Sequence, residues 1–181
     1  MVKFTSVKNN KRKYLYFEIE RIERLMLEEN QNKTCLFFAS DYHFEMMTLP
    51  YITNNLNDNK KIIVLTDNDL EESIKKVLSG TNLNKKIEKQ ILEIDWNNND
   101  LEKIKEIEKL KIQKKDAVVF IKGKENYIKK INKDINNIIK NQKMLIIDCF
   151  DINEIEDNID LVADKYEKIL KTTGIVSTKN K

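Results

Sequence analysis

The chain has 181 residues, of which 40% are hydrophobic and 35% are charged, so it is long enough to bury the core of one domain. Lysine and arginine number 33 against 30 aspartates and glutamates, and a formal net charge of +3 gives no reason to expect a nucleic-acid partner. The sequence holds 2 cysteines, 3 glycines and 1 histidine, which excludes a disulfide scaffold, glycine-rich dinucleotide-binding loops and histidine-rich metal sites.

The residues before position 33 give the first expectations about organisation. Residues 1–13 contain the basic run Lys8–Lys13 and are expected to form a flexible tail. A single domain should follow over residues 14–176, and residues 177–181 should fray. Its first element is an amphipathic helix whose apolar stripe is Leu15, Ile19, Ile22 and Met26. We expect this stripe to dock on its own domain; the alternative is a helix that forms a homodimer or binds a partner.

Two apolar runs, Cys35–Ala39 and Ile62–Leu65, organise the chain, and a polar turn follows each. Such runs are typical of strands that are covered on both faces of a parallel sheet. The segment between them is long enough for a crossover helix, so a right-handed βαβ unit is expected. Asp41 should cap that helix, and Pro50 should kink it or start a new one.

Helices and strands are expected to alternate over the rest of the chain. After the second strand we predict, in order, a helix capped by Asp67 or Asp69 and ended by Gly80, a strand over 90–96, a helix over 101–112, a strand over 117–121, a helix over 127–139, a strand over 144–150, a helix from Asp151 ended by Gly174, and a short edge strand at Ile175–Val176. This pattern predicts a three-layer α/β fold, RecA-like or Rossmann-like, in which a mainly parallel sheet of five to six strands carries helices on both faces.

The cellular environment follows from the cysteines and from the hydropathy of the chain. Cys35 and Cys149 both lie in apolar runs, so we expect buried thiols in a reducing cytoplasm. The first residues carry charges without a long apolar region after them, so no signal peptide is expected. No run approaches the roughly 18 apolar residues of a membrane span. We therefore expect a cytoplasmic protein that does not associate with membranes.

Several catalytic motifs are absent from the sequence. The turn after the first predicted strand is SDYHFE, which has no glycine to let backbone amides surround a phosphate. The sequence has no Gly-x-x-x-x-Gly-Lys-Ser/Thr, no His-Glu-x-x-His and no Gly-x-Ser-x-Gly. We therefore assign no catalytic residue, no metal ligand and no cofactor, and we expect a protein that is not an enzyme.

In parallel α/β sheets, ligands bind beyond the carboxyl ends of the strands. That rule points to five segments, SDYH at 40–43, TDN at 66–68, DWN at 95–97, KGK at 122–124 and DCFD at 148–151. The candidate ligand-binding residues are Ser40, Asp41, Tyr42, His43, Asp67, Asp148 and Asp151. The alternative interpretation is purely structural: His43 packs at a helix start and the aspartates cap helices. The alternative function is a metal-dependent enzyme that uses Asp67, Asp148 and Asp151.

Parts of the sequence also resemble a known family. The segments that carry the likeness are Leu36-Phe37-Phe38, Leu49-Pro50-Tyr51-Ile52, Asn55-Leu56-Asn57 and Lys61–Leu65, followed by Leu145–Asp151 and Thr173–Val176. Taken in this order they resemble MEDS, a sensory domain of methanogen and methylotroph signalling proteins that is related to RecA-like ATPases without the phosphate loop. The resemblance implies a non-catalytic sensor of a small molecule such as a hydrocarbon derivative. Family members are often joined to a DNA-binding or kinase module. We expect no room for such a module in this chain, so its output is expected to pass through a protein partner.

Overall fold

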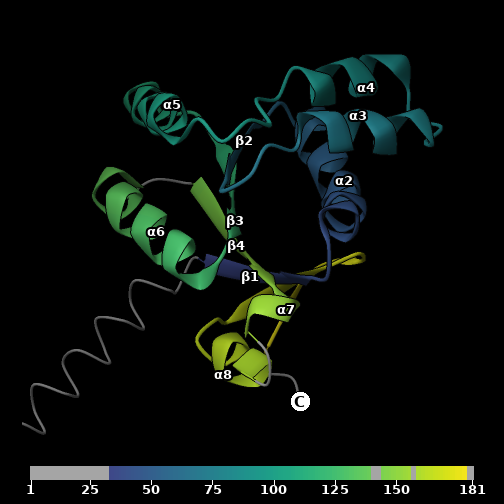
Figure 1. The fold of residues 1–181 in the computed structure, drawn as a ribbon. Helices are drawn as coiled ribbons and strands as arrows, with labels where there is room; N and C mark the ends of the chain where they lie inside the picture. The colour runs from purple at the N-terminus through teal and green to yellow at the C-terminus, as the bar shows by residue number, and fades with distance from the viewer. Residues whose placement is uncertain (1–32, 140–143, 156–157, 179–181) are drawn as a thin grey trace, which may run out of the picture. The chain divides into compact units, whose positions relative to one another are not determined.

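The computed structural model describes residues 33–139, 144–155 and 158–178. The helix predicted around Leu15–Met26 and the tail before it lie outside these ranges, so the predicted domain bounds stay a prediction. The described residues form one sheet with helices on both of its faces (Figure 1). Within these ranges, every helix is too short or too polar to cross a membrane.

The sheet has six strands in the order β2-β3-β4-β1-β5-β6. The strands are β1 (Lys33–Phe38), β2 (Lys61–Thr66), β3 (Ala117–Gly123), β4 (Met144–Asp151), β5 (Lys168–Lys171) and β6 (Gly174–Ser177). The first five are parallel to their neighbours, and β6 pairs antiparallel with β5 at the edge. The predicted mainly parallel sheet and the predicted short edge strand at Ile175–Val176 are therefore confirmed.

The helices form the two outer layers. One face of the sheet carries α2 (Asp41–Asn57), α3 (Glu71–Ser79) and α4 (Lys85–Leu92), and the other carries α5 (Asp100–Ile112), α6 (Glu125–Ile139), α7 (Ile152–Ile155) and α8 (Ile159–Ala163). Figure 1 shows α2 to α4 on one side of the strands and α5 with α6 on the other. This arrangement confirms the three-layer α/β fold.

Successive side chains of β3 pack alternately into the two hydrophobic cores on either face of the sheet. Val118 and Phe120 pack with the α2–α4 layer, while Val119 and Ile121 pack with the α5–α8 layer. All four side chains are at most 1% exposed. A strand that is buried on both faces needs apolar residues at every position, because each fully buried aliphatic side chain contributes roughly 1.5–3 kcal/mol. The continuous apolar runs of the sequence follow from this double burial.

The strand predicted over 90–96 is wrong. Residues Lys85–Leu92 form α4, whose Ile87 and Ile91 lie one turn apart and face the core. The loop after it buries Trp96, whose ring N–H donates to the carbonyl of Ile91 at 2.9 Å. The apparent alternation of Leu92, Ile94 and Trp96 therefore arises at a helix end, where Leu92 is 44% exposed.

The long helix predicted from Asp151 to Gly174 is also wrong. The chain instead forms the short helices α7 and α8 and then enters β5. Ile169 packs in one core and Leu170 in the other, as neighbouring residues of a strand do and neighbouring residues of a helix on one face do not. Pairing of β5 with β1 decides this segment, because the pairing satisfies the backbone of β5 within the sheet.

The crossover helix α2 begins and continues differently from the prediction. Ser40, not Asp41, is its N-cap, and the Ser40 hydroxyl accepts a hydrogen bond from the His43 backbone N–H at 3.1 Å. The helix runs through Pro50 without restarting, and Pro50 lies on the exposed side. The N-cap of the next helix is Leu70, not Asp67 or Asp69, although Asp69 accepts a hydrogen bond from the Glu71 N–H at 2.8 Å.

Candidate functional site

A group of polar side chains lies at the carboxyl ends of β1, β2 and β3. We call Asp41, Glu45, Asn68 and Lys122 the edge cluster. Asp41 and Glu45 lie on the first turns of α2, Asn68 follows β2, and Lys122 is in the last part of β3. These residues come from three different strand–helix connections and meet only because the parallel strands end at the same edge of the sheet.

Lys122 is the centre of this cluster. Its side chain is 4% exposed, and its ammonium group lies 2.8 Å from Asp41 Oδ1 and 2.8 Å from Asn68 Oδ1. The same Nζ lies 5.0 Å from the ring centroid of Phe38 and 5.7 Å from that of Phe44. A buried ammonium group needs hydrogen-bond acceptors, and aromatic faces add further attraction. Lys122 therefore ties β3 to both α2 and the β2–α3 loop.

Asn68 completes the connection between its neighbours. Its amide nitrogen donates to Asp41 Oδ2 at 2.9 Å, while its amide oxygen accepts from Lys122. The hydroxyl of the buried Thr66 lies 3.1 Å from Asn68 Oδ1 and 2.9 Å from the Asn68 carbonyl, which fixes the turn after β2. Asp41, Asn68 and Lys122 thus form a closed ring of contacts in which each residue binds the other two.

Glu45 lies one helical turn beyond Asp41 and is fully buried. Its Oε2 accepts a hydrogen bond from the Ser73 hydroxyl of α3 at 2.9 Å, whereas Oε1 has no partner among the described residues. Burial raises the pKa of this carboxyl, and the nearby Asp41 raises it further, while the Ser73 hydrogen bond and the Lys122 charge lower it. An unpaired buried oxygen is costly, so this position favours any group that can donate to it.

The other predicted residues of the β1–α2 turn have local roles or face solvent. His43 is exposed rather than packed, and its Nδ1 accepts a hydrogen bond from the Ala39 N–H at 3.0 Å, which closes the turn before α2. Tyr42 is 62% exposed, and Met46, one turn further along α2, is 42% exposed. Ser40 and His43 therefore position the start of α2, and the Tyr42 side chain is exposed to solvent.

The structure does not bring the predicted aspartates together. Asp67 accepts a hydrogen bond from the Lys124 N–H at 3.1 Å, at the start of α6. A Cβ at Gly123 would lie 2.7 Å from the Asp67 carboxylate, so glycine is needed for this close approach. Asp151 accepts from the N–H of Asn153 at 2.9 Å, and Asn153 in turn donates to the Ala39 carbonyl at 3.0 Å. Each aspartate therefore accepts hydrogen bonds within a different turn.

Asp148 lies in a different place, inside the α5–α8 layer. It pairs with Cys35 in the register of β4 with β1 and is 1% exposed. Its two carboxylate oxygens accept hydrogen bonds from the Tyr166 hydroxyl at 2.6 Å and the Asn132 amide at 2.9 Å. We call Asp148, Asn132 and Tyr166 the core cluster. Burial raises the pKa of Asp148, and the two hydrogen bonds lower it.

The structure also tests the metal-site alternative and the two cysteines. Across the described ranges, no group of three or more histidine, cysteine, aspartate or glutamate side chains is arranged to hold a metal ion. Cys35 and Cys149 are buried and unpaired with each other, as predicted. Burial raises the pKa of Cys35 to about 12 and raises that of Cys149 well above its usual value. Both thiols therefore stay protonated at neutral pH.

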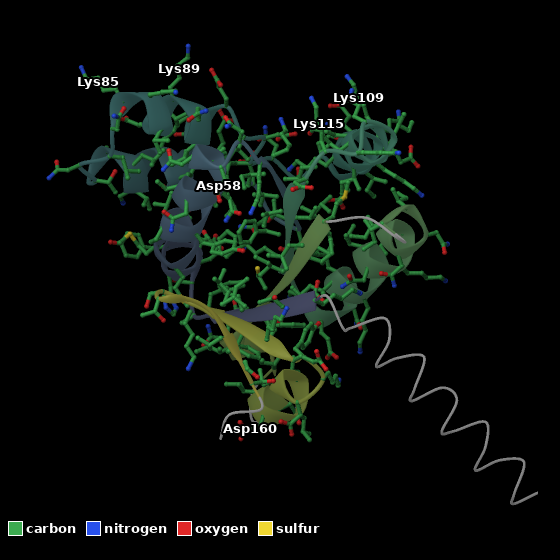
Figure 2. All side chains as sticks on the ribbon, turned by 180° about the vertical axis from the view of Figure 1, so that it is seen from behind. Asp58, Lys85, Lys89, Lys109, Lys115 and Asp160 are labelled. Carbon is green, nitrogen blue, oxygen red and sulfur yellow. The ribbon has the colours of Figure 1, made fainter. Side chains whose placement is uncertain are left out.

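Exposed lysines lie on several elements outside the edge cluster. Figure 2 shows Lys85 and Lys89 projecting outward from α4 and Lys109 from α5, with Lys115 in the loop before β3. Lys89 lies 3.8 Å from Glu93, an exposed pair of the kind that contributes little stability. These lysines are dispersed over the surface, consistent with the small net charge of the chain.

Sequence reasoning missed the centre of the site. Lys122 and Asn68 fall within the predicted strand-end segments but are not among the predicted ligand-binding residues, and neither is Glu45. One signal was available for Lys122, because a lysine that directly continues a buried apolar strand must find acceptors at the end of that strand. Comparison with known proteins adds nothing to this geometry: no protein-family profile, no curated protein and no solved structure matches the chain.

Proposed function

We propose that the domain is a non-catalytic regulatory module that binds a small ligand at the edge cluster and signals through a protein partner. The observation that carries this proposal is the contact of Lys122 with Asp41 and Asn68, which ties together the chain segments that follow β1, β2 and β3. Its position fits the rule that ligands of parallel sheets bind beyond the carboxyl ends of the strands. The MEDS resemblance of the sequence supports the same class of function.

The edge cluster offers a physical route from ligand to partner. The Asp41 side chain is 42% exposed although its partner Lys122 is buried, so a ligand that approaches from solvent can take the place of Asp41 beside Lys122. Such competition would loosen the first turn of α2 from β3. The exposed Tyr42 and Met46 lie on that same part of α2 and would move with it. A partner that binds this surface would then distinguish the two states by their difference in binding free energy.

The experiment is thermal unfolding of the full chain against a panel of small molecules that includes nucleotides, divalent metals, amines, carboxylates and apolar metabolites. A ligand present at 100 times its dissociation constant should stabilise the native state by about 2.7 kcal/mol. The Lys122→Met variant, which keeps the apolar stem, should lose this stabilisation. Lys124→Met is the matched control, because Lys124 pairs with Glu154 at 3.1 Å outside the edge cluster.

The outcomes separate the hypotheses. Stabilisation that disappears in Lys122→Met and persists in Lys124→Met supports ligand binding at the edge cluster. Turnover of a substrate, or stabilisation by a divalent metal that the Asp67→Asn variant abolishes, would replace the proposal with an enzyme. A ligand whose effect survives the Lys122 substitution would place the binding site elsewhere.

A further inference from the structure

The outer face of α5 carries the two most exposed large apolar side chains of the described residues. Leu101 is 66% exposed and Ile112 is 82% exposed. Lys105 and Glu108 stand between them and are also exposed. The four residues follow one another at spacings of four, three and four, so they form one line along the helix. We call Leu101, Lys105, Glu108 and Ile112 the α5 stripe.

The α5 stripe has no partner among the described residues. The helix contacts β2 and α6, and it buries Ile107 and Leu110 in the core of the α5–α8 layer. Figure 1 shows α5 at the end of that layer, with α6 as its neighbour. Lys105 and Glu108 form no ion pair with any described residue. A single exposed apolar residue is ordinary on a protein surface, so the order of the residues along the stripe has to carry the argument.

That order is self-complementary about its midpoint. Two copies of α5 can pack antiparallel about a two-fold axis that passes midway between positions 106 and 107. Leu101 then lies opposite Ile112 of the second copy, and Lys105 lies opposite Glu108 of the second copy. The axis repeats both contacts, because the two subunits of such a dimer use the same surface patch. A parallel pair would instead bring Lys105 against Lys105 and Glu108 against Glu108, and these like charges repel.

We propose that α5 is the contact face of a homodimer, in which two copies of the chain pack the α5 stripe antiparallel about a two-fold axis. The proposal goes beyond the proposed function, and it assigns self-association to α5 instead of the helix predicted around Leu15–Met26. Because α5 and α2 lie in opposite layers, the dimer leaves the exposed Tyr42 and Met46 accessible to a different partner.

The size of the contact sets the expected strength of the dimer. α5 has 13 residues and is therefore about 20 Å long. A pair of such helices should bury less than the roughly 1,200 Å² at which standard protein interfaces begin. We therefore expect a weak dimer whose population depends on the concentration of the chain.

The test is sedimentation velocity of the full chain at concentrations from about 10 µM to about 1 mM, the range suited to so small an interface. The sedimentation coefficient should rise with concentration from that of a monomer toward that of a dimer. Lys105→Glu and Glu108→Lys should each weaken dimerisation about tenfold. The two-fold axis places every substitution in the contact twice, so each variant turns two attractions into two repulsions.

Exchanging the two charges tests the antiparallel arrangement. The double variant Lys105→Glu/Glu108→Lys should restore the dimer, because opposite charges again face each other. An equimolar mixture of the two single variants should associate more tightly than either variant alone, since an acidic stripe then meets a basic one. Lys85→Glu is the matched control, because Lys85 projects from α4 in the opposite layer (Figure 2) and its substitution should leave dimerisation unchanged.

Ile112→Gln tests the apolar ends of the stripe. It should weaken dimerisation about tenfold and leave the thermal unfolding of the dilute chain unchanged, because an exposed side chain contributes little to the stability of the monomer. Leu161→Gln is the matched control, since Leu161 is 64% exposed on α8, and the change should affect neither measurement.

Self-association that the single charge reversals weaken and the double exchange restores supports the proposal. A chain that stays monomeric over the whole concentration range overturns it, and so does a dimer that no α5 variant weakens. A dimer that the exchange fails to restore overturns the antiparallel arrangement. A lower unfolding temperature of dilute Ile112→Gln would mean that another part of the chain covers the stripe, which also overturns the proposal.

Discussion

The edge cluster and the core cluster both supply a carboxylate beside the sheet with hydrogen-bond donors, but they differ in how far that carboxylate is exposed to solvent. Each places a carboxylate against the sheet and surrounds it with hydrogen-bond donors, one in the α2–α4 layer and the other in the α5–α8 layer. The Asp41 side chain is 42% exposed, whereas Asp148 is 1% exposed. A ligand can reach the first carboxylate and not the second. Accessibility to solvent, more than residue type, therefore distinguishes a candidate binding site from a structural group.

The difference in exposure also changes the free energy that each carboxylate loses when its partners are removed. A buried carboxylate that loses its partners cannot rehydrate, whereas a half-exposed one exchanges its protein partners for water at small cost. Substitutions in the core cluster should therefore act mainly on stability, and substitutions in the edge cluster mainly on binding. Four measurements test this difference between the two clusters.

The largest effect is expected for Asp148→Ala. The substitution leaves the Tyr166 hydroxyl and the Asn132 amide without their acceptor and opens a small cavity, so unfolding should become easier by about 3 kcal/mol. Urea denaturation at neutral pH measures this change. Asp151→Ala is a suitable comparison, because Asp151 caps a short surface turn and should cost about 1 kcal/mol. Equal losses in the free energy of unfolding for the two variants would show that Asp148 contributes no more to stability than a surface aspartate.

A smaller loss is expected for Tyr166→Phe. The variant keeps the ring, which lies 6.0 Å from the Phe150 ring, and removes only the hydroxyl that donates to Asp148 Oδ2. Leaving that buried oxygen without a donor should cost about 1–3 kcal/mol. The double variant with Asp148→Asn, compared with both single variants, isolates the coupling between the two residues. Additive effects would mean that the two side chains act independently despite their contact.

Lys122→Met should cost less still, about 1 kcal/mol or below, because the half-exposed Asp41 can be hydrated and the methionine stem still covers Phe38 and Phe44. Chemical denaturation of the variant without ligand provides the measurement. A loss as large as that of Asp148→Ala would remove the distinction between the two clusters and mark the edge cluster as structural.

The smallest effect concerns pH. Burial raises the folded-state pKa of Asp148 above its unfolded value, so the native state binds the proton more tightly than the unfolded chain. The stability linked to that proton is present in full below the unfolded pKa, near 4, and is lost as pH rises through the folded pKa. Denaturation of the native protein across this range should show a decline that Asp148→Asn lacks. Glu45→Gln should remove a second decline of the same sign.

Local sequence is sufficient to predict the position and type of strands that are buried on both faces. The runs that became β1, β2, β3 and β4 are apolar throughout, which only a doubly covered strand requires at that length. The apolar faces of α3 and α5 were likewise recognisable from their spacing. The class of fold followed from the alternation of these elements.

Short segments with mixed patterns were not predictable in this way. Residues 90–96 and 168–171 each contain apolar residues that fit either period, and tertiary packing chose between them. Trp96 became buried in a loop because its ring N–H found the Ile91 carbonyl, and Leu170 became part of a strand because β1 offered an unpaired edge. The competing periods differ little in local energy, so long-range contacts decide.

The amino-acid pattern is sufficient to predict a layered α/β domain with polar groups at its strand ends. Which of those groups come into contact depends on strand order and long-range packing. Asp41 and Asn68 are 27 residues apart and Asn68 and Lys122 are 54 apart, yet strand order brings them into contact, while Asp148, within a segment that sequence also favoured, points into the opposite layer. The reason is physical: the parity of a residue along its strand fixes the face it occupies, and the order of strands fixes its neighbours.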